Sequence, residues 1–329
     1  MTLLADVADA PVFATHTRAW TWSDVFLATR LWGEWDALLD ATRDADAPPE
    51  AVKGAGRDWR TARRLIAGDE LKAWLERRRL SISDWNAYVR RAIGERPADA
   101  PPQPAVLWAQ GACSGAWDDV AHRLAARAAA WEDAGAPDTR QPPAPAWFQR
   151  MPSAAEAAEI GVNPAQVASR CGDLWAVETA LARLRAAAAA SDAVAAAVTA
   201  HNVDWLCIEC DWLEAGDENV AREAALLARE GVAMSDIAGR AQLPLEPRRV
   251  YVGDLDERLQ PTLTSAAPGD LIGPLSAGNG SGPWVVAAVR EKVVPSLDDP
   301  DIRARAEEAA VAAAVLRAVE EQVSWHEHD

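Results

Sequence analysis

The spacing of apolar residues changes along the chain, from a helical period before residue 200 to strand-like runs after Val203. After Ser83, a predicted N-cap, the apolar residues Trp85, Tyr88, Val89, Ala92 and Ile93 recur every three or four positions, as on one face of an amphipathic helix. Further helices are predicted over 23–44, 58–79, 115–134 and 174–200, with a break at Pro48-Pro49 and Gly54–Gly56. Apart from an extended piece at Arg18–Trp22, the first 200 residues are predicted to be helical.

After Val203 short strands and helices are predicted to alternate. Strand-like apolar runs cover 203–213, 248–252, 271–275 and 283–291, and helical patterns cover 217–230, 235–240 and 255–265. Ser235 is the expected N-cap of the second of these helices, and Gly278–Gly282 the expected hairpin loop between the last two strands. The predicted order is therefore β-α-α-β-α-β-β.

A last long helix is predicted over 300–324. Asp299 is its expected N-cap, with Pro300 at the first helical position. One stripe of this helix carries Ile302, Ala306, Ala309, Ala313, Leu316 and Val323. Because the stripe is rich in alanine, it permits close approach to a partner helix.

Two stretches carry a resemblance to known families. The element order after Val203, with PGDLIGPL at 268–275, resembles a parvulin-type (PpiC-like) prolyl isomerase domain. The segment ARRLIAGDELKAWLERRRLSISDWNAYVRRAI, at 62–93, resembles the N-terminal helical domain of SurA-like chaperones. The resemblance implies an α+β protein with a largely helical chaperone region and a small parvulin-like antiparallel sheet. The expected domains are 1–96 (helical), 97–200 (linker and helical segment), 201–294 (parvulin-like) and 295–329 (a helix that packs back on the first domain).

The composition of the chain limits the classes of partner and the cellular compartment that are expected. The chain has 33 Lys and Arg against 50 Asp and Glu, a net charge of −17, which disfavours nucleic acid as a partner. The chain contains no run of 18 apolar residues, so no membrane span is predicted. The first residues also lack the pattern of a signal peptide, and a cytoplasmic protein is therefore expected. The 16 tryptophans, beside three Phe and two Tyr, either fill core positions or form half-exposed indoles that grip a client, and the sequence leaves both open.

The residues on which parvulin chemistry depends are missing. The resemblance implies one histidine near Glu209–Asp211 and another where Trp284 stands, but no histidine lies between Val203 and Lys292. Leu259, Leu263 and Thr264 stand where the family's pocket aromatic is expected. The domain is therefore predicted to have lost its reaction centre. Cys210 is the remaining catalytic candidate, and the peptide-binding candidates are Trp212, Leu259, Leu263 and Trp284.

No cofactor or metal site is predicted. Cys207 and Cys210 form a CxxC pair, but residues three apart on a strand point to opposite faces, so buried free thiols are expected. His326 and His328 lie in the C-terminal tail, where a frayed terminus is the simpler interpretation.

Three functions remain in view. The favoured one is a non-catalytic chaperone that holds an extended or unfolded peptide through apolar pockets and pairing along a sheet edge. The alternative is an active peptidyl-prolyl isomerase with an atypical site, and the third is a structural subunit of a biosynthetic complex. Through PGDLIGPL and PSLDDPDIRARAEEA (295–309) the chain also resembles parvulin-related proteins of ribosomal-peptide maturation clusters, which implies a precursor peptide or a maturation enzyme as partner.

Overall fold

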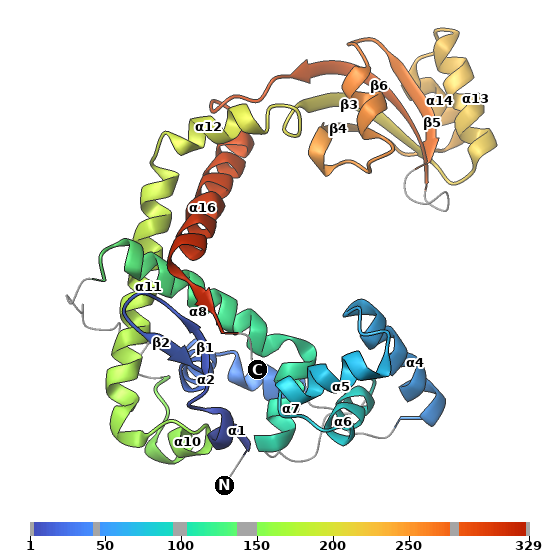
Figure 1. Cartoon of the computed structure of the whole chain (residues 1–329). Helices are drawn as coiled ribbons and strands as arrows, with labels where there is room; N and C mark the ends of the chain where they lie inside the picture. Colours follow the sequence, from blue (N-terminus) through green and yellow to red (C-terminus); the bar gives the residue numbers. More distant parts are fainter. Residues whose placement is uncertain (1–2, 42–46, 95–103, 137–149, 277–282, 327–329) are drawn as a thin grey trace. The chain divides into compact units, whose positions relative to one another are not determined.

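The computed structural model describes residues 3–41, 47–94, 104–136, 150–276 and 283–326. The chain divides into two compact units: the helical unit, Met1–Ala186 with Ala313–Asp329, and the sheet unit, Ala187–Ala312. Helices predominate in the first, and the second is built on a four-stranded antiparallel sheet (Figure 1). The prediction of an α+β protein is confirmed.

The helical unit contains α1 (Leu3–Val7), α2 (Trp22–Leu31), α3 (Trp35–Asp40), α4 (Pro49–Ala62), α5 (Gly68–Arg77), α6 (Ile82–Ala92), α7 (Pro104–Ser114), α8 (Ala116–Asp133), α10 (Ala154–Glu159) and most of α11 (Val167–Ala189), with a 3-10 turn at Pro164–Gln166. Helix α6 begins two residues earlier than predicted, because Ser81 and not Ser83 caps it, accepting a hydrogen bond from the Asp84 amide. The helix predicted over 174–200 is two helices, α11 and α12 (Ala193–Ala200), which are separated at Ser191.

A small sheet in the helical unit corrects the expectation that the first 200 residues are helical. Strands β1 (Pro11–Ala14), β2 (Ala19–Thr21) and β7 (Ser324–Trp325) pair antiparallel in the order β2-β1-β7. The extended piece predicted at Arg18–Trp22 is confirmed as β2. The Phe13 ring lies between Trp20 and Trp325, with ring centroids 5.8 and 5.5 Å away. Strand β1 pairs both with the neighbouring β2 and with β7 from the other end of the chain, and only the β2 partner was open to a local prediction.

The predicted break between the first helices is confirmed at Pro48, which precedes α4, and is wrong at Gly54–Gly56. Helix α4 begins at Pro49 and continues through Gly54 and Gly56. Proline at the first helical position removes only an amide that has no partner in the helix, so it starts the helix and does not stop it. The break comes after α4 instead, where Arg64 adopts a positive φ of 57°, and it divides the helix predicted over 58–79 into α4 and α5.

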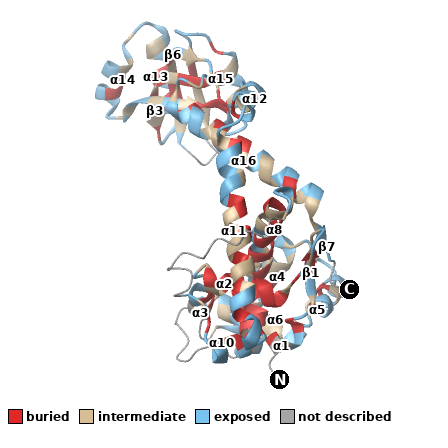
Figure 2. Ribbon diagram, turned by 90° about the vertical axis from the view of Figure 1, so that its left-hand side faces the viewer, coloured by how far each residue is buried: buried red, intermediate tan, exposed pale blue. Residues whose placement is uncertain are grey.

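Aromatic residues interlock in the core of the helical unit, where buried positions line α2 and α8 (Figure 2). The ring of Phe26 meets Trp108 and Trp117 edge-on, at centroid distances of 6.1 and 5.1 Å. The Trp117 indole lies against Gly111, where an added Cβ would come within 2.2 Å of the ring. Most of the described tryptophans are buried or half-buried, so core packing is confirmed as their main role.

The sheet unit contains α12, β3 (Cys207–Ala215), α13 (Glu218–Arg229), α14 (Met234–Ala241), β4 (Leu245–Tyr251), a 3-10 turn at Val252–Asp254, α15 (Gln260–Ser265), β5 (Leu271–Ser276), β6 (Trp284–Val293) and the first half of α16 (Pro300–Gln322). The sheet order is β4-β3-β6-β5, and every neighbouring pair is antiparallel. The predicted order β-α-α-β-α-β-β is confirmed. The expected cap Ser235 is wrong, since Ala233 precedes the first turn of α14.

The start of α16 is as predicted, but its single stripe is not. The Asp299 carboxylate accepts a hydrogen bond from the Asp301 amide at 2.9 Å and so caps the helix. Ile302 and Ala306 are buried in the sheet unit. Further on, Val315 packs on Leu181 in the helical unit, whereas Leu316 is 59% exposed. The buried face shifts because the two halves of α16 contact different neighbours.

Some predicted features fall outside the described residues. These are the loop Gly278–Gly282, most of the linker 97–104, most of the breaker-rich run 135–145, and the tail beyond His326. Among the described helices, none is long and apolar enough to cross a membrane.

Candidate functional site

The two faces of the four-stranded sheet are covered by different elements. Along β3, Ile208, Cys210 and Trp212 point to the face that α15 covers, and Leu213 and Ala215 point to the face that α13 and α14 cover. This alternation follows from the two-residue period of a strand. The face under α15 is where the parvulin resemblance puts the reaction centre, and it is therefore the candidate site.

Four of the predicted site residues meet on this face. Cys210 and Trp212 of β3, together with Leu259 and Leu263 at the start and middle of α15, belong to one buried apolar cluster. The cluster is completed by Ile208, Val252, Ala266, Ile272, Val285, Ala287 and Val289. Trp212 is 6% exposed and Leu263 is 1% exposed. The side chains fill the space between sheet and helix, so the cluster is a closed core in this conformation.

The Cys210 thiol has little nucleophilic character. It is fully buried, and its Sγ lies 3.9 Å from the carbonyl oxygen of Arg248. Burial raises the pKa of Cys210 to about 11, because a thiolate would lose its hydration. At neutral pH the group is a protonated thiol, and thiols attack as thiolates. The residue therefore lacks the activation that a catalytic cysteine needs.

Charged side chains cover the outer edge of the cluster at Trp212. The indole Nε1–H of Trp212 donates to Glu214 Oε1 at 2.9 Å, and the Arg248 guanidinium carbon lies 5.2 Å from the ring centroid. Arg248 also donates to Glu214 and to Glu246, each at 2.9 Å. These contacts satisfy the indole donor and hold Arg248 over the ring. The network orients Trp212 inward and separates it from solvent.

Trp284 does not join the other candidates. It opens β6 and pairs with Ala215 of β3, so its half-buried side chain packs on the face that α13 covers. Since side chains alternate along β6, Val285 takes the place toward α15. A shared surface of Trp212 and Trp284 is not formed in the structure. Peptide binding by either residue stays a prediction.

The two cysteines of the CxxC pair point to opposite faces, as predicted. Cys207 packs beside Tyr251 and Ile302, in a cluster separate from that of Cys210. The described residues contain four free cysteines, all of them buried. Within those residues no group of three His, Cys, Asp or Glu side chains could hold a metal ion.

Three of the described histidines, His16, His122 and His201, lie away from the candidate site. His201 stacks on Trp205 at 4.7 Å, His122 lies 4.5 Å from the ring of Trp325, and the His16 ring nitrogen lies 2.8 Å from Gln322. None of these partners belongs to the apolar cluster around Cys210. The imidazoles missing from the sequence of this domain are therefore not replaced by these histidines.

Both edges of the sheet carry features that hinder addition of another strand. The edge strand β4 contains Pro247, which has no amide hydrogen, and the charged Glu246 and Arg249. In the edge strand β5, the carbonyl oxygen of Gly273 accepts a hydrogen bond from Arg229 at 2.8 Å, and Pro274 follows. Proline and charge are usual protections of edge strands. Pairing of a peptide along these edges therefore gains no support from the structure.

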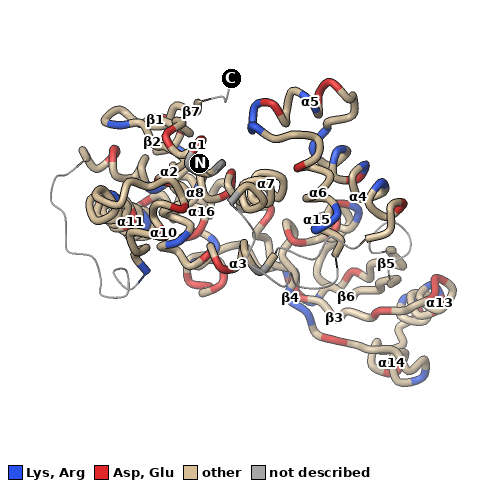
Figure 3. The backbone as a smooth tube through the Cα atoms, turned by 90° about the horizontal axis from the view of Figure 1, so that it is seen from below, with Lys and Arg blue, Asp and Glu red and all other residues tan. Residues whose placement is uncertain are grey.

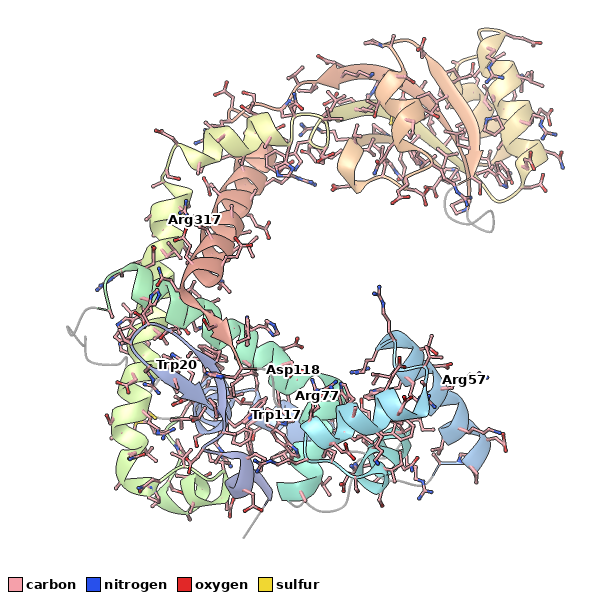
Figure 4. All side chains as sticks on the ribbon, in the orientation of Figure 1. Trp20, Arg57, Arg77, Trp117, Asp118 and Arg317 are labelled. Carbon is pink, nitrogen blue, oxygen red and sulfur yellow. The ribbon has the colours of Figure 1, made fainter. Side chains whose placement is uncertain are left out.

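The helical unit offers concave surfaces that the sequence did not indicate. One cavity, of about 70 Å³, is lined by Trp22, Trp108, Trp117, Arg77 and Asp118 among others (Figure 4). Its indole donors are used internally, since the Nε1–H of Trp117 donates to the Trp108 carbonyl at 3.1 Å and that of Trp108 to the Arg78 carbonyl at 2.8 Å.

A larger groove, of about 680 Å³, lies between α4 and α6. Its cationic side chains, Lys53, Arg57 and Arg60, follow one face of α4 at the spacing i, i+4, i+7. The sequence shows this spacing, but it puts the three cations on one face only if residues 53–60 form one helix. The predicted break at 54–56 excluded that helix, so the cationic face was not predicted.

The comparisons with known proteins do not assign the chain to a family. Neither the comparison with protein-family models nor that with curated proteins gave a match. Among solved structures, PrsA from Bacillus subtilis is similar at a TM-score of 0.24 and 13% identity, over 68% of this chain and 89% of the PrsA chain. A TM-score this low carries no argument about fold or function. The function has to be inferred from the chain itself.

Proposed function

We propose that this protein is a non-catalytic, chaperone-like protein that binds extended or unfolded peptide. The closed apolar cluster around Cys210, at the place where the parvulin resemblance expects a reaction centre, carries the non-catalytic part of the proposal, and peptide binding is proposed from the resemblance to SurA-like chaperones. The cluster contains no group that titrates near neutral pH, because the pKa of its one ionisable side chain, Cys210, is about 11.

Catalysis of prolyl isomerisation would need more than this cluster supplies. The rotation barrier of the peptide bond is about 18–20 kcal/mol, and a catalyst must seat the proline and stabilise the twisted bond. Trp212, Leu259 and Leu263 are 6%, 4% and 1% exposed, so they offer little accessible surface to a proline ring. The alternative of an active isomerase would require α15 to move away and expose a protonated thiol. No contact of the described residues favours that alternative.

The finer parts of the proposal rest on the resemblance and on the cysteines. A precursor peptide of ribosomal origin, or an enzyme that matures one, is the proposed partner. A cytoplasmic location is proposed because all four cysteines are free and buried, a state that suits a reducing compartment. A purely structural subunit would bind an enzyme but no free peptide.

Two assays test the proposal together. In a protease-coupled assay on an X-Pro peptide, we expect no isomerisation above the uncatalysed rate. In a light-scattering assay, we expect the full chain to delay aggregation of a reduced, unfolded test protein. Turnover that Cys210→Ala abolishes and Cys207→Ala leaves intact would establish the isomerase instead. Failure to delay aggregation, with no binding of unfolded polypeptide, would leave the structural subunit.

A further inference from the structure

The groove between α4 and α6 combines cations with an apolar floor. Lys53, Arg57 and Arg60 of α4 line one side, and Trp85 of α6 lines the other. Its volume of about 680 Å³ lies within the range of about 300–1,000 Å³ that is usual for ligand sites. A ligand with carboxylates and an apolar side chain would match both surfaces.

The charge of this part of the chain is opposite to that of the whole. Residues 49–94 contain eleven Lys or Arg and six Asp or Glu, whereas the whole chain has a net charge of −17. Figure 3 marks the cationic positions that recur along α4 in blue. Glu50, in the first turn of α4, is the acidic side chain that lines the groove. The local excess of positive charge favours an acidic ligand.

The cations of the groove are available to a ligand. Lys53 is exposed and has no ion pair within the part of the chain that the structure describes. Arg57 is 81% exposed, and its 3.7 Å contact with the equally exposed Asp58 is a weak surface pair. Arg60 donates its Nε–H to the Leu65 carbonyl at 2.9 Å and a second N–H to the carbonyl of Ile66. Those bonds fix its guanidinium in place before any ligand binds.

The floor of the groove is rigid and largely apolar. The buried ring of Trp85 lies so close to α4 that a Cβ on Gly56 would be 3.1 Å from it. Val52 packs beside it on the core. Asn86 adds a side-chain amide that has no hydrogen-bond partner among the described residues, and an amide can pair with a peptide backbone.

Gly54 keeps the wall of the groove free of a side chain. Glycine inside a helix costs about 0.8–1.0 kcal/mol relative to alanine. The close approach of Trp85 explains Gly56, but nothing lies within 4 Å of where the Gly54 side chain would be. Gly54 lines the groove and leaves its wall open. Gly172 and Gly239 are helical glycines with equally open surroundings, so Gly54 shows only that the backbone of α4 is accessible from the groove.

We propose that this groove binds an extended acidic peptide, with its carboxylates on Lys53, Arg57 and Arg60 and one apolar side chain on Trp85. The inference rests on the proposed function, since it names the class of peptide and the place where it binds. A peptide is favoured over a nucleic acid because the chain as a whole repels a polyanion, while the groove itself is short and contains Glu50.

Fluorescence anisotropy tests the inference with the full chain. The probe is a short labelled peptide in which glutamates flank one phenylalanine, and the comparison peptides carry glutamine or lysine in place of glutamate. We expect the acidic peptide to bind most tightly and its affinity to fall as salt is added. Lys53→Glu or Arg57→Glu should weaken binding about tenfold each, the cost of losing a charge-assisted contact. Arg90→Glu, an exposed change on α6 outside the groove, should leave the affinity unchanged.

A second variant blocks the groove without changing its charge. Gly54→Leu should abolish binding, whereas Gly172→Leu, at an open glycine of α11, should not. Equal binding of the lysine peptide, equal binding of single-stranded DNA, or indifference to Arg57→Glu would overturn the inference. If neutral unfolded polypeptide still binds in those cases, the proposed function stands without this site. If no peptide binds, both fail.

Discussion

The helical unit and the sheet unit bury apolar surface in different ways. In the helical unit large indoles interlock, with centroid distances of 5.1 Å for Phe26 and Trp117 and 5.1 Å for Trp59 and Trp74. In the sheet unit the central cluster is mainly aliphatic and holds one indole, Trp212. The concave sites described above lie among the indoles and helices, while the cluster under α15 is closed.

The two units therefore differ in whether they offer an open surface to a ligand. The sheet unit has a filled centre and protected sheet edges, whereas the helical unit has an open groove lined by cations. Recognition is therefore expected in the helical unit.

The largest expected effect tests how much the helical unit depends on its indoles. Trp117 is 1% exposed and contacts Phe26, Trp35 and Trp108. Trp117→Ala should lower the free energy of unfolding by about 3–5 kcal/mol, since it leaves a cavity at the centre of the aromatic network. Urea denaturation followed by far-UV circular dichroism measures the change.

Amide exchange makes the same test specific to each unit. Trp117→Ala should reduce protection in α2, α7 and α8, whereas Leu263→Ala should reduce it in α15 and the sheet and cost about 2–5 kcal/mol. A loss under about 1 kcal/mol for Trp117→Ala would mean that the indoles are not the main support of the helical unit.

The second prediction concerns the buried thiols and alkaline pH. Burial raises the pKa of Cys113 in the helical unit to about 12 and that of Cys210 in the sheet unit to about 11. Above pH 9 the thiols of the unfolded chain lose protons while the folded ones keep them, so stability falls as pH rises. Each thiol should contribute about 1.4 kcal/mol per pH unit, up to its own pKa in the folded state.

Variants assign the slope to one unit or the other. Cys113→Ala should make the fall in unfolding free energy between pH 9 and 11 less steep, and its effect should continue to higher pH than that of Cys210→Ala. The measurement is urea denaturation at a series of pH values. Reaction of either cysteine with a disulfide reagent in the folded protein at pH 8, faster than unfolding, would contradict the prediction.

Local patterns in the sequence were enough for most of the sheet unit. The strand runs, the helix at 217–230 and the cap at Asp299 depend on neighbouring residues, and the structure confirms them. The opposite directions of Cys207 and Cys210 follow from the strand period alone.

Features that depend on distant partners could not be read in this way. Strand β7 completes the small sheet by pairing with β1 from the other end of the chain, and no local pattern indicates that partner. Trp212 and Trp284 were both predicted to face the peptide, but Trp284 pairs with Ala215, three positions from Trp212, so strand alternation puts the two indoles on opposite faces, and the sequence does not indicate that register. The groove is formed by α4 and α6 together, and the sequence does not indicate that these two helices pack against each other.

The third prediction asks whether charge, and not aromatic packing, anchors α16 in the sheet unit. The Asp299 carboxylate accepts hydrogen bonds from the Asp301 amide at 2.9 Å and from the Arg249 guanidinium at 2.7 Å. Asp299→Ala should cost about 0.5–2 kcal/mol in unfolding free energy, the usual range for an N-cap. Asp298→Ala, one position earlier and outside the cap, should cost less than about 0.5 kcal/mol.

The pH dependence gives this prediction a second readout. The hydrogen bond from Arg249 lowers the pKa of Asp299, so its contribution is complete above the ordinary pKa of 3.8 and is lost as pH falls through the lowered value. The stability difference between wild type and Asp299→Ala should therefore shrink in acid. A difference that stays constant from pH 6 to below the ordinary pKa would show that the carboxylate contributes no charge interaction.

The smallest expected effect concerns the cost of keeping the groove open. Gly54→Ala should raise the unfolding free energy by about 0.5–1 kcal/mol, because alanine is the better helix former and nothing lies within 4 Å of the new methyl group. Gly172→Ala should give a similar gain in α11, where there is also open space.

Gly56→Ala is the matched contrast within the same helix. Its methyl group would meet the Trp85 ring at 3.1 Å, so the gain in helix propensity should be cancelled or reversed. Thermal and urea denaturation measure the stability of the three variants. Gly54→Ala and Gly172→Ala should be more stable than wild type, and Gly56→Ala should be as stable as wild type or less stable. If Gly54→Ala gave no gain while Gly172→Ala did, the space beside Gly54 would not be open in solution. The helical unit would then be as closed as the sheet unit at this point.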